Sequence, residues 1–328
     1  MKMKRRILWR SAASLVLAML PIAVSSASAV YPDRPIRLIV GQAPGGATDI
    51  VARAFAKVLA DELGQNVVVD NRTGAGGTIG ATLAANSAPD GYTLLLGTNG
   101  PIAIAQHIMS KLQYDPEKAF EPVALFSQVP YIVVTHPSVK AATLGELVAL
   151  AKSRPGEIQF ASSGLGSTPH LCMELFRNLT GVDMLHVPYR GGAPAQVDLV
   201  AGRVHAYCAG FPALSGHVRA GKIRALAVTA SERARLMPEL PTSAEAGVPG
   251  LEVNAWNGLL APRGTPRHVI ERLYKAVVAA ANRPEFEKEL DARGVEKLVL
   301  DPKAFGAYIE REAAKWARVA RAGKLKAH

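Results

Sequence analysis

The most constraining feature of this sequence is a regular alternation between short runs of branched apolar residues and stretches with helical periodicity. Ile36 to Val40 has the composition of a buried strand, and apolar side chains from Val51 to Leu59 then recur at helical spacing until Gly64 ends the pattern. The same alternation returns along most of the chain. It is typical of α/β folds, in which helices cover the faces of largely parallel sheets.

The alternation falls into two halves, the second of which begins near Tyr131. In the first half, further elements are predicted as strands at 67–69 and 93–96 and a helix at 78–85. In the second half, the predicted strands lie at 132–135, 159–161, 184–187, 204–208 and 225–228, and the predicted helices begin at Thr143, Thr168 and Pro194. The sequence therefore predicts two α/β units of similar construction.

The start of one predicted helix has a specific signature, because Thr143 and Glu146 have the spacing of a capping box. After Trp256 the chain is largely helical. The last helix carries Phe305 and Trp316 on one apolar stripe, and we expect it to pack back against the first half.

The first thirty residues have the pattern of a secretory signal. A basic start is followed by an apolar stretch from Ser11 to Val24 and by the small-residue cleavage site Ala27-Ser28-Ala29. The apolar stretch is shorter than the roughly 20 residues that a membrane span requires. We therefore predict that residues 1–29 are a signal peptide cleaved after Ala29, and that the remainder is exported to the periplasm. That remainder is long enough for two domains of roughly 150 residues each.

The formal net charge of +11 is partly due to this leader, which holds basic residues and no acidic ones. The other Lys and Arg residues are spread through the predicted helices and the tail at 321–326, without interleaved aromatic residues. A nucleic-acid partner is therefore not expected. The charge balance by itself favours an anionic ligand only weakly.

Two loops share a design that suits an anion. Ala43 to Asp49 and Ser162 to His170 each follow a predicted strand, contain glycine and lead into a helix whose first N–H groups are free to bind a ligand. Neither loop contains Lys or Arg, so we expect backbone amides and hydroxyls to hold a carboxylate with little dependence on salt. In either loop alone, the glycines are equally well explained by a tight turn; the presence of the design in both halves favours a ligand site.

The candidate ligand contacts from the two loops are Ala43, Pro44, Gly45, Gly46, Thr48, Asp49, Ser162, Ser163, Gly164, Gly166, Ser167, Thr168 and His170. His170 is expected to act as a hydrogen-bond donor at the helix start. Further candidate contacts are Thr98, Asn99 and Tyr189, together with an aromatic lining from Phe211 and Trp256. Tyr131 is a further candidate for that lining.

Motifs of enzymes are mostly missing. Gly74 to Gly80 resembles a dinucleotide fingerprint, but its last glycine comes one residue late and no acidic residue follows at the expected distance. The sequence has no Gly-x-Ser-x-Gly nucleophile elbow and no phosphate loop ending in Gly-Lys-Ser/Thr. The eight histidines show no metal-ligand spacing. We therefore predict no catalytic residue, no metal site and no cofactor.

Cys172 and Cys208 are the two cysteines of the chain. Two cysteines do not make a disulfide scaffold, but an oxidising compartment would permit them to pair. The sequence leaves a disulfide and two separate buried thiols equally open.

Several short segments make the sequence similar to the Bug-type receptors, the substrate-binding proteins of tripartite tricarboxylate transporters. The segments are spread over the whole predicted mature chain and comprise residues 31–36, 43–49, 71–77, 89–94, 166–171, 186–191, 219–222 and 259–262. The resemblance implies a type II periplasmic-binding-protein fold, a Venus flytrap of two α/β domains joined by two crossover segments. On this basis domain 1 comprises 30–131 and 255–328, and domain 2 comprises 132–254.

The resemblance also implies a function. The two glycine-bearing loops would pinch one carboxylate of a small organic mono- or dicarboxylate between the domains, and the receptor would deliver it through transient contact with an inner-membrane transporter. Many relatives carry an Asp where this chain reads Cys208-Ala209-Gly210-Phe211, so an amino-acid ligand is less favoured here. A monomer is expected. The alternatives are a sensory receptor for a membrane kinase and a carboxylate-handling enzyme on the same scaffold.

Overall fold

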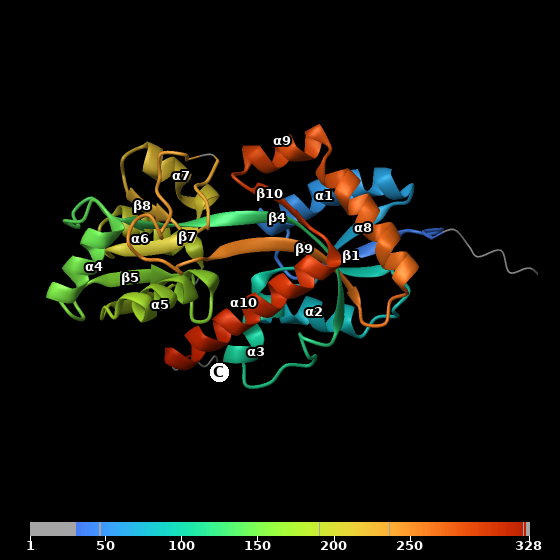
Figure 1. Cartoon of the computed structure of the whole chain (residues 1–328), viewed down its shortest axis with the longest axis horizontal. Coiled ribbons are helices and arrows are strands. Elements are labelled where there is room, and N and C mark those ends of the chain that lie inside the picture. The colour runs from blue at the N-terminus through green and yellow to red at the C-terminus, as the bar shows by residue number, and fades with distance from the viewer. Residues whose placement is uncertain (1–30, 46, 190, 236, 324, 326–328) are drawn as a thin grey trace, which may run out of the picture. The chain divides into compact units, whose positions relative to one another are not determined.

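The computed structural model describes residues 31–45, 47–189, 191–235, 237–323 and 325. The predicted leader, its cleavage after Ala29 and the candidate contact Gly46 lie outside the described residues. Within the described part of the chain, no helix is long and apolar enough to cross a membrane. The strands form two sheets that share one long strand, and helices cover both (Figure 1).

The first sheet has a parallel part and an antiparallel part. The parallel part consists, in spatial order, of β2 (Val67–Asn71), β1 (Ile36–Val40) and β3 (Thr93–Gly97). The antiparallel part consists of β9 (Asn254–Pro262), the first portion of β4 (Phe120–Thr135) and β10 (Glu296–Leu300). Leu38 and Ile39 are both fully buried, because helices cover both faces of β1.

Two groups of helices cover this sheet. On one face lie α1 (Ala47–Leu63), α8 (Arg267–Ala281) and α9 (Pro284–Ala292). On the other lie α2 (Thr78–Ala85), η2 (Gly100–Ile104) and part of α10 (Pro302–Ala322). The short elements η1 (Ala75–Gly77) and α3 (Ala105–Ile108) adjoin α2 and η2, and Ile108 of α3 packs in the core of the second half. The first face is held by aromatic packing, in which Phe55 stacks on Phe126 with ring centroids 3.8 Å apart and Phe286 packs beside them.

The second sheet is built around β7. Its strands, in spatial order, are β8 (Arg224–Val228), the last portion of β4, β7 (Ala206–Gly210), β5 (Gln159–Ser162) and β6 (Leu185–Pro188). Its helices are α4 (Leu144–Ser153) and α5 (Thr168–Thr180) in one core and α6 (Gly192–Val200) and α7 (Phe211–Arg219) in the other. Thr143 caps α4 as predicted, since the Glu146 N–H donates to Thr143 Oγ1 (3.1 Å), whereas the Glu146 carboxylate accepts from the Ala142 N–H (2.7 Å) instead of the Thr143 N–H of a complete capping box.

Two predicted boundaries in this sheet were wrong by two residues. The strand expected from Val204 begins at Ala206, because the chain is still turning through Gly202, whose φ is +72°. The helix expected to begin at Pro194 begins at Gly192. Residues 168–180 are helical as predicted, as are residues 78–85.

Strand β4 connects the two sheets. Phe120 to Pro130 pairs with β9, whereas Tyr131 to Thr135 pairs with β7 and β8. The sequence predicted only residues 132–135 of this strand, because Pro122 and Pro130 are unfavourable inside a ladder. The register of the pairing with β9 shifts on either side of Leu125, and these irregularities accommodate the residues that break the ladder.

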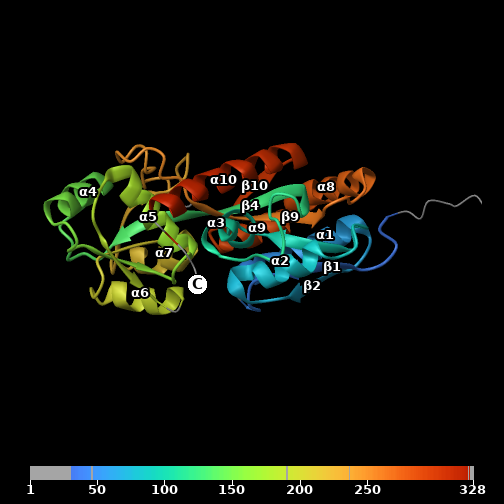
Figure 2. The same ribbon diagram turned by 90° about the horizontal axis from the view of Figure 1, so that it is seen from below.

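Helix α10 packs on the first sheet, as expected, and it also packs against α5 of the second half. Its Phe305 lies edge-on against Trp256 of β9, with ring centroids 5.4 Å apart. Its Trp316 is instead fully buried in the core that contains Leu171 and Leu175 of α5. Both views of the ribbon show the helix extending from the first sheet towards α5 (Figures 1 and 2).

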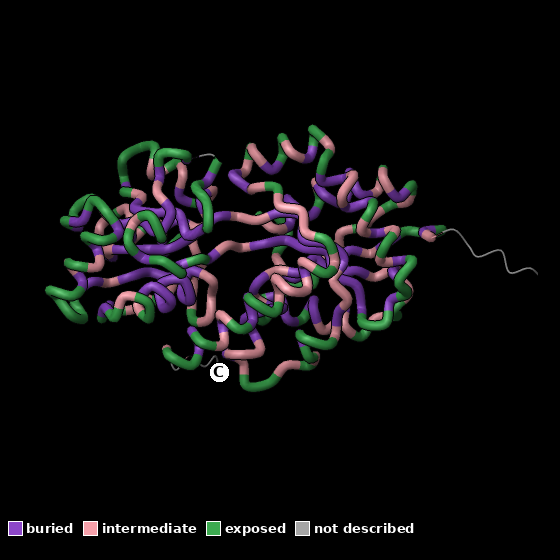
Figure 3. The backbone as a smooth tube through the Cα atoms, viewed as in Figure 1, coloured by how far each residue is buried: buried purple, intermediate pink, exposed green. Residues whose placement is uncertain are grey.

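Cys172 of α5 and Cys208 of β7 form a disulfide, with their Cα atoms 6.2 Å apart. This decides between the two alternatives that the sequence left open. The bond fastens α5 to the central strand of the second sheet. Both residues lie in the buried interior, which the burial view shows along the strands and the inner faces of the helices (Figure 3).

Candidate functional site

A cavity of about 890 Å³ lies between the strand ends of the two sheets. The first sheet contributes the start of α1, the turn after β3 and the turn between α9 and β10; the second contributes the start of α5 and one side of α7. The predicted contacts that line it are Thr48, Thr98, Asn99, Ser163, Gly166, Ser167, Thr168, Phe211 and Trp256. The two predicted anion loops thus meet at one cavity, although each comes from a different sheet.

At the start of α5, Ser167 is the N-cap residue. Its hydroxyl accepts from the His170 N–H (3.4 Å) and donates to the Gly164 carbonyl (2.6 Å), so the loop uses this side chain for its own structure. Pro169 has no N–H, and the Leu171 N–H donates to the Ser167 carbonyl. Among the described residues, none accepts a hydrogen bond from the Thr168 N–H. This amide is the donor that the helix start offers to a ligand.

Two tyrosine hydroxyls stand beside this helix start. Tyr131 lies near the side chain of Thr168, and burial raises the pKa of Tyr131 to about 12. Tyr207 lies near the side chain of Ser163, and burial also raises its pKa. Both tyrosines line the cavity and stay protonated at neutral pH, so this wall is polar and uncharged.

Asp49 holds the other loop from behind. Its carboxylate accepts from the Gly45 N–H (2.9 Å), from Asn71 Nδ2 (2.8 Å) and from Arg53 Nε (2.9 Å). Burial raises the pKa of Asp49, but the hydrogen bonds from Arg53, Gly45 and Asn71 outweigh burial and hold this pKa below its ordinary value. Asp49 is 1% exposed and does not line the cavity. The predicted ligand contact is therefore corrected to a residue that shapes the loop.

His170 also differs from its prediction. Its Nδ1 accepts from the Gly166 N–H (3.1 Å), and its ring stacks on His186 with centroids 4.0 Å apart. Burial and the neighbouring His186 lower the pKa of His170 to about 3, so the imidazole is neutral. Because the side chain is buried behind the loop and accepts rather than donates, it supports the loop instead of lining the cavity.

Other predicted contacts lie away from the cavity wall. Ser162 is fully buried and its hydroxyl contacts His186 Nε2 (2.6 Å). The Tyr189 hydroxyl donates to Asp198 (2.8 Å) in α6. The remaining predicted contacts that do not line the cavity are Ala43, Pro44, Gly45 and Gly164. Other residues of the same two loops line the cavity, because only part of a tight turn can face the cavity.

Asn99 and Trp256 line the cavity but are engaged in the fold. Asn99 Nδ2 donates to the Asn254 carbonyl (2.7 Å), and Asn99 Oδ1 accepts from the Trp256 N–H (3.0 Å). The Trp256 ring packs edge-on against Phe305 and Tyr308. These two residues therefore fix the beginning of β9 at the cavity.

Sequence reasoning missed several parts of the wall. Gln42, Gln196, Tyr207, Ser215, Arg219 and the turn at 291–295 all line the cavity. The two arginines of this set, Arg219 and Arg293, come from α7 and from the end of α9, so the cavity wall has cations although the two loops have none. Tyr207 lies inside a predicted strand and Arg219 begins one of the segments shared with the receptor family, but neither pattern indicated a ligand contact.

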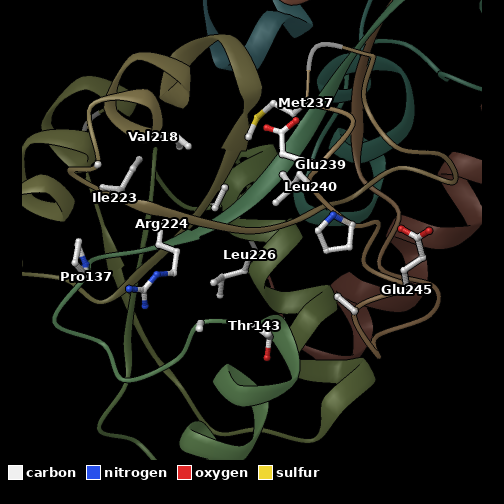
Figure 4. A pocket seen from close by; sticks show the side chains of 15 residues that line it. Pro137, Thr143, Val218, Ile223, Arg224, Leu226, Met237, Glu239, Leu240 and Glu245 are labelled. Atoms are coloured by element: carbon white, nitrogen blue, oxygen red, sulfur yellow. The ribbon is translucent and has the colours of Figure 1, made fainter.

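A second cavity of about 750 Å³ lies beside β8 (Figure 4). None of the predicted contacts lines it. Two of its charged side chains are engaged in the fold, since Arg224 donates to the Ala141 carbonyl (3.0 Å) and Glu245 pairs with Arg233 (2.9 Å). We therefore assign the candidate site to the cavity between the sheets. Across the described chain there is no group of three or more His, Cys, Asp or Glu residues that could hold a metal ion.

The fold and the position of the cavity define a class: a type II periplasmic-binding-protein fold, in which two α/β domains are joined by crossover segments. The model of the TctC family, the tripartite tricarboxylate transporter family receptors, matches residues 51–325. The chain belongs to this family. This confirms the resemblance found in the sequence.

Characterised relatives agree with this assignment. Protein BugT of Bordetella pertussis is 40% identical over 308 residues, which cover 94% of each chain. The structure of Rpa4515 of R. palustris with adipate is 38% identical, has a TM-score of 0.77, and the match covers 90% of this chain and 99% of that one. MatC from Rhodopseudomonas palustris, with bound malate, is 35% identical with a TM-score of 0.73 and coverage of 88% and 99%.

Proposed function

We propose that this protein is an exported receptor that binds a small organic carboxylate in the cavity between its two sheets and delivers it to a tripartite tricarboxylate-type transporter. The observation that carries the proposal is the convergence of two helix starts, those of α1 and α5, on one cavity from opposite sheets. The free Thr168 N–H and the protonated Tyr131 hydroxyl are donors suited to a carboxylate. Related structures with adipate and malate support the same ligand class.

The proposal includes the domain limits, with 30–131 and 255–328 in domain 1 and 132–254 in domain 2. Two observations support them: β4 changes from the first to the second sheet between Pro130 and Tyr131, and β9 begins at Asn254. It also includes a periplasmic location after cleavage behind Ala29, a monomeric receptor and no catalytic activity. Two similar solved structures, a periplasmic transporter and the periplasmic binding protein BugD, support the location.

The alternative functions make different demands. An enzyme would require an activated nucleophile or a metal, and the tyrosines and hydroxyls of the wall offer neither. A sensory receptor would bind the same ligand and pass the signal to a membrane kinase. Product analysis after incubation with the bound acid separates the enzyme from the two receptor functions.

The central test is calorimetric titration of residues 30–328 with organic acids, together with thermal unfolding. A ligand that binds only the folded state stabilises it by about 2.7 kcal/mol at a hundredfold excess over its dissociation constant. The amide of each acid serves as the neutral control. Equal binding of acid and amide would contradict a carboxylate site.

Thr168→Pro is the sharpest variant for the helix start. It removes the N–H that lacks a protein acceptor, and proline is well tolerated at the first position of a helix. Ser167 already has φ −69° and ψ 154°, which is the conformation preferred before proline. We expect at least tenfold weaker binding of the acid with unchanged folding. Thr168→Val keeps the N–H and removes the hydroxyl, so binding within about threefold of wild type would assign the loss to the amide.

A further inference from the structure

The charged residues of the cavity wall differ in whether an opposite charge pairs with them. Three charged residues line it, namely Arg219, Asp291 and Arg293. Arg293 pairs with Glu289 and also donates to the Glu289 carbonyl (3.0 Å), and Asp291 pairs with Arg235. In the described chain no carboxylate lies within salt-bridge distance of Arg219. Arg219 is therefore the cation of this wall that no acidic side chain neutralises.

The position of Arg219 along α7 gives it a place in the cavity. Phe211, Ser215 and Arg219 are spaced by four residues, form one stripe of the helix and all line the cavity. At a rise of about 1.5 Å per residue, the backbone of Arg219 lies about 12 Å along the helix from that of Phe211. One side of the cavity therefore follows α7 from its first residue to its last.

The first residue of α7 lies beside the start of α5. Gly210 precedes α7 and pairs with Tyr131 in the second sheet, and Gly210, Tyr131 and Thr168 all line the cavity. The donor amide of Thr168 and the guanidinium of Arg219 thus belong to opposite ends of one wall. The side chains along this wall between them are neutral: Tyr207, Gln196 and Ser215. A ligand that satisfies both ends needs two anionic groups joined by an uncharged spacer.

We infer that Arg219 is the specificity residue of this cavity, because its guanidinium is placed to bind the distal carboxylate of a linear dicarboxylate whose first carboxylate lies at the starts of α1 and α5. On this inference Arg219 distinguishes dicarboxylates from monocarboxylates of the same length. The inference rests on the proposed function and adds a specificity residue to it. Guanidinium is suited to the role because it presents a planar pair of donors to a carboxylate and stays charged at every relevant pH.

The test compares α,ω-dicarboxylates from succinate to suberate with monocarboxylates of equal chain length, each titrated calorimetrically into wild type and Arg219→Gln. Wild type is expected to bind the best dicarboxylate at least tenfold more tightly than its monocarboxylate counterpart. Arg219→Gln is expected to lower the affinity for that dicarboxylate about tenfold and to change the affinity for the monocarboxylate less than twofold. Arg219→Lys keeps the charge without the planar donor pair, so an intermediate loss is expected.

Arg154→Gln is the matched control. Arg154 is an exposed arginine beside the second sheet and lies outside the cavity, so its removal changes the net charge equally but leaves both ligand classes within twofold. Raising the salt concentration should weaken dicarboxylate binding more in wild type than in Arg219→Gln. The inference is overturned if Arg219→Gln weakens the binding of both ligand classes equally, or if it leaves dicarboxylate binding unchanged. In either case, binding of carboxylates by wild type would still support the proposed function. A wild-type protein that binds no acid contradicts the proposed function as well.

Discussion

At the residue scale, the site depends on side chains that lie behind its wall. Asp49 and His170 were expected to touch a ligand, and instead they hold Gly45 and Gly166 of the two loops by single hydrogen bonds. A backbone amide that points at a ligand has a fixed direction only when its neighbours are held, which is the role of these two side chains. Polar residues in a ligand-binding motif therefore need not be ligand contacts.

Asp49→Asn tests this role. Because the native pKa of Asp49 is lowered, its contribution to stability is present above its unfolded pKa of about 3.9 and is lost as pH falls through the lower native value. The variant retains one acceptor oxygen but loses the charge that Arg53 and Gly45 contact, and we expect it to lower the free energy of unfolding by about 1–3 kcal/mol at pH 7. The difference should persist at pH 5 and shrink below about pH 4.

Urea unfolding of wild type and variant at pH 7, 5 and 3.5 measures this effect. Asp61→Asn removes an exposed carboxylate from the same helix and is expected to change stability by less than about 0.5 kcal/mol. A variant as stable as wild type at pH 7 would show that the loop does not need the Asp49 charge.

At the scale of elements, the disulfide between α5 and β7 fixes one half of the site to its sheet. The cysteines are 36 residues apart, and closing such a loop restricts the unfolded chain. Replacing both Cys172 and Cys208 by Ala is expected to lower the free energy of unfolding by about 2–4 kcal/mol. Urea unfolding of wild type and of the double variant, each with and without reductant, measures this loss.

The reductant supplies the internal control for this prediction. Wild type in reductant should approach the stability of the double variant, whereas reductant should leave the double variant unchanged. A wild-type transition that does not move in reductant would mean that the two thiols are not paired in the folded protein.

At the scale of the whole molecule, contacts beside the cavity join the two sheets. The turn between α9 and β10 contacts the second half, where Arg235 pairs with Asp291 and its N–H donates to Glu296 (3.2 Å). Gly294 in this turn lies close to Phe211, since a Cβ placed on it would be 2.9 Å from the Phe211 ring. Together with β4 and α10, these contacts determine how closely the walls of the cavity approach each other.

Asp291→Asn is therefore expected to weaken ligand binding without changing ligand choice. An exposed ion pair contributes up to about 1 kcal/mol, so the loss should not exceed about fivefold and should appear mainly in the dissociation rate. Stopped-flow measurements of ligand release provide the test. Asp183→Asn, which breaks an exposed contact with Arg177 away from the cavity, should leave release unchanged. Identical release rates for wild type and Asp291→Asn would show that this contact does not hold the cavity closed.

The sequence by itself determined the α/β class, the limits of helices such as 78–85 and 168–180, and the two loops at the helix starts. These features are encoded within a few residues, by apolar periodicity, capping side chains and glycine turns. The first part of β4 was not predictable, because Pro122 and Pro130 break the local pattern of a strand whose pairing partners lie far away in the sequence.

Only the tertiary structure decided which residues form the cavity wall. The pairing of Cys172 with Cys208, the burial of His170 behind its loop and the position of Arg219 all depend on segments distant in sequence coming together. Arg219 is the last residue of α7, and the sequence of this segment does not indicate that its side chain faces a ligand cavity. Local chemistry fixes what each segment becomes, whereas the packing of two sheets determines which side chains face one another across a ligand-sized space.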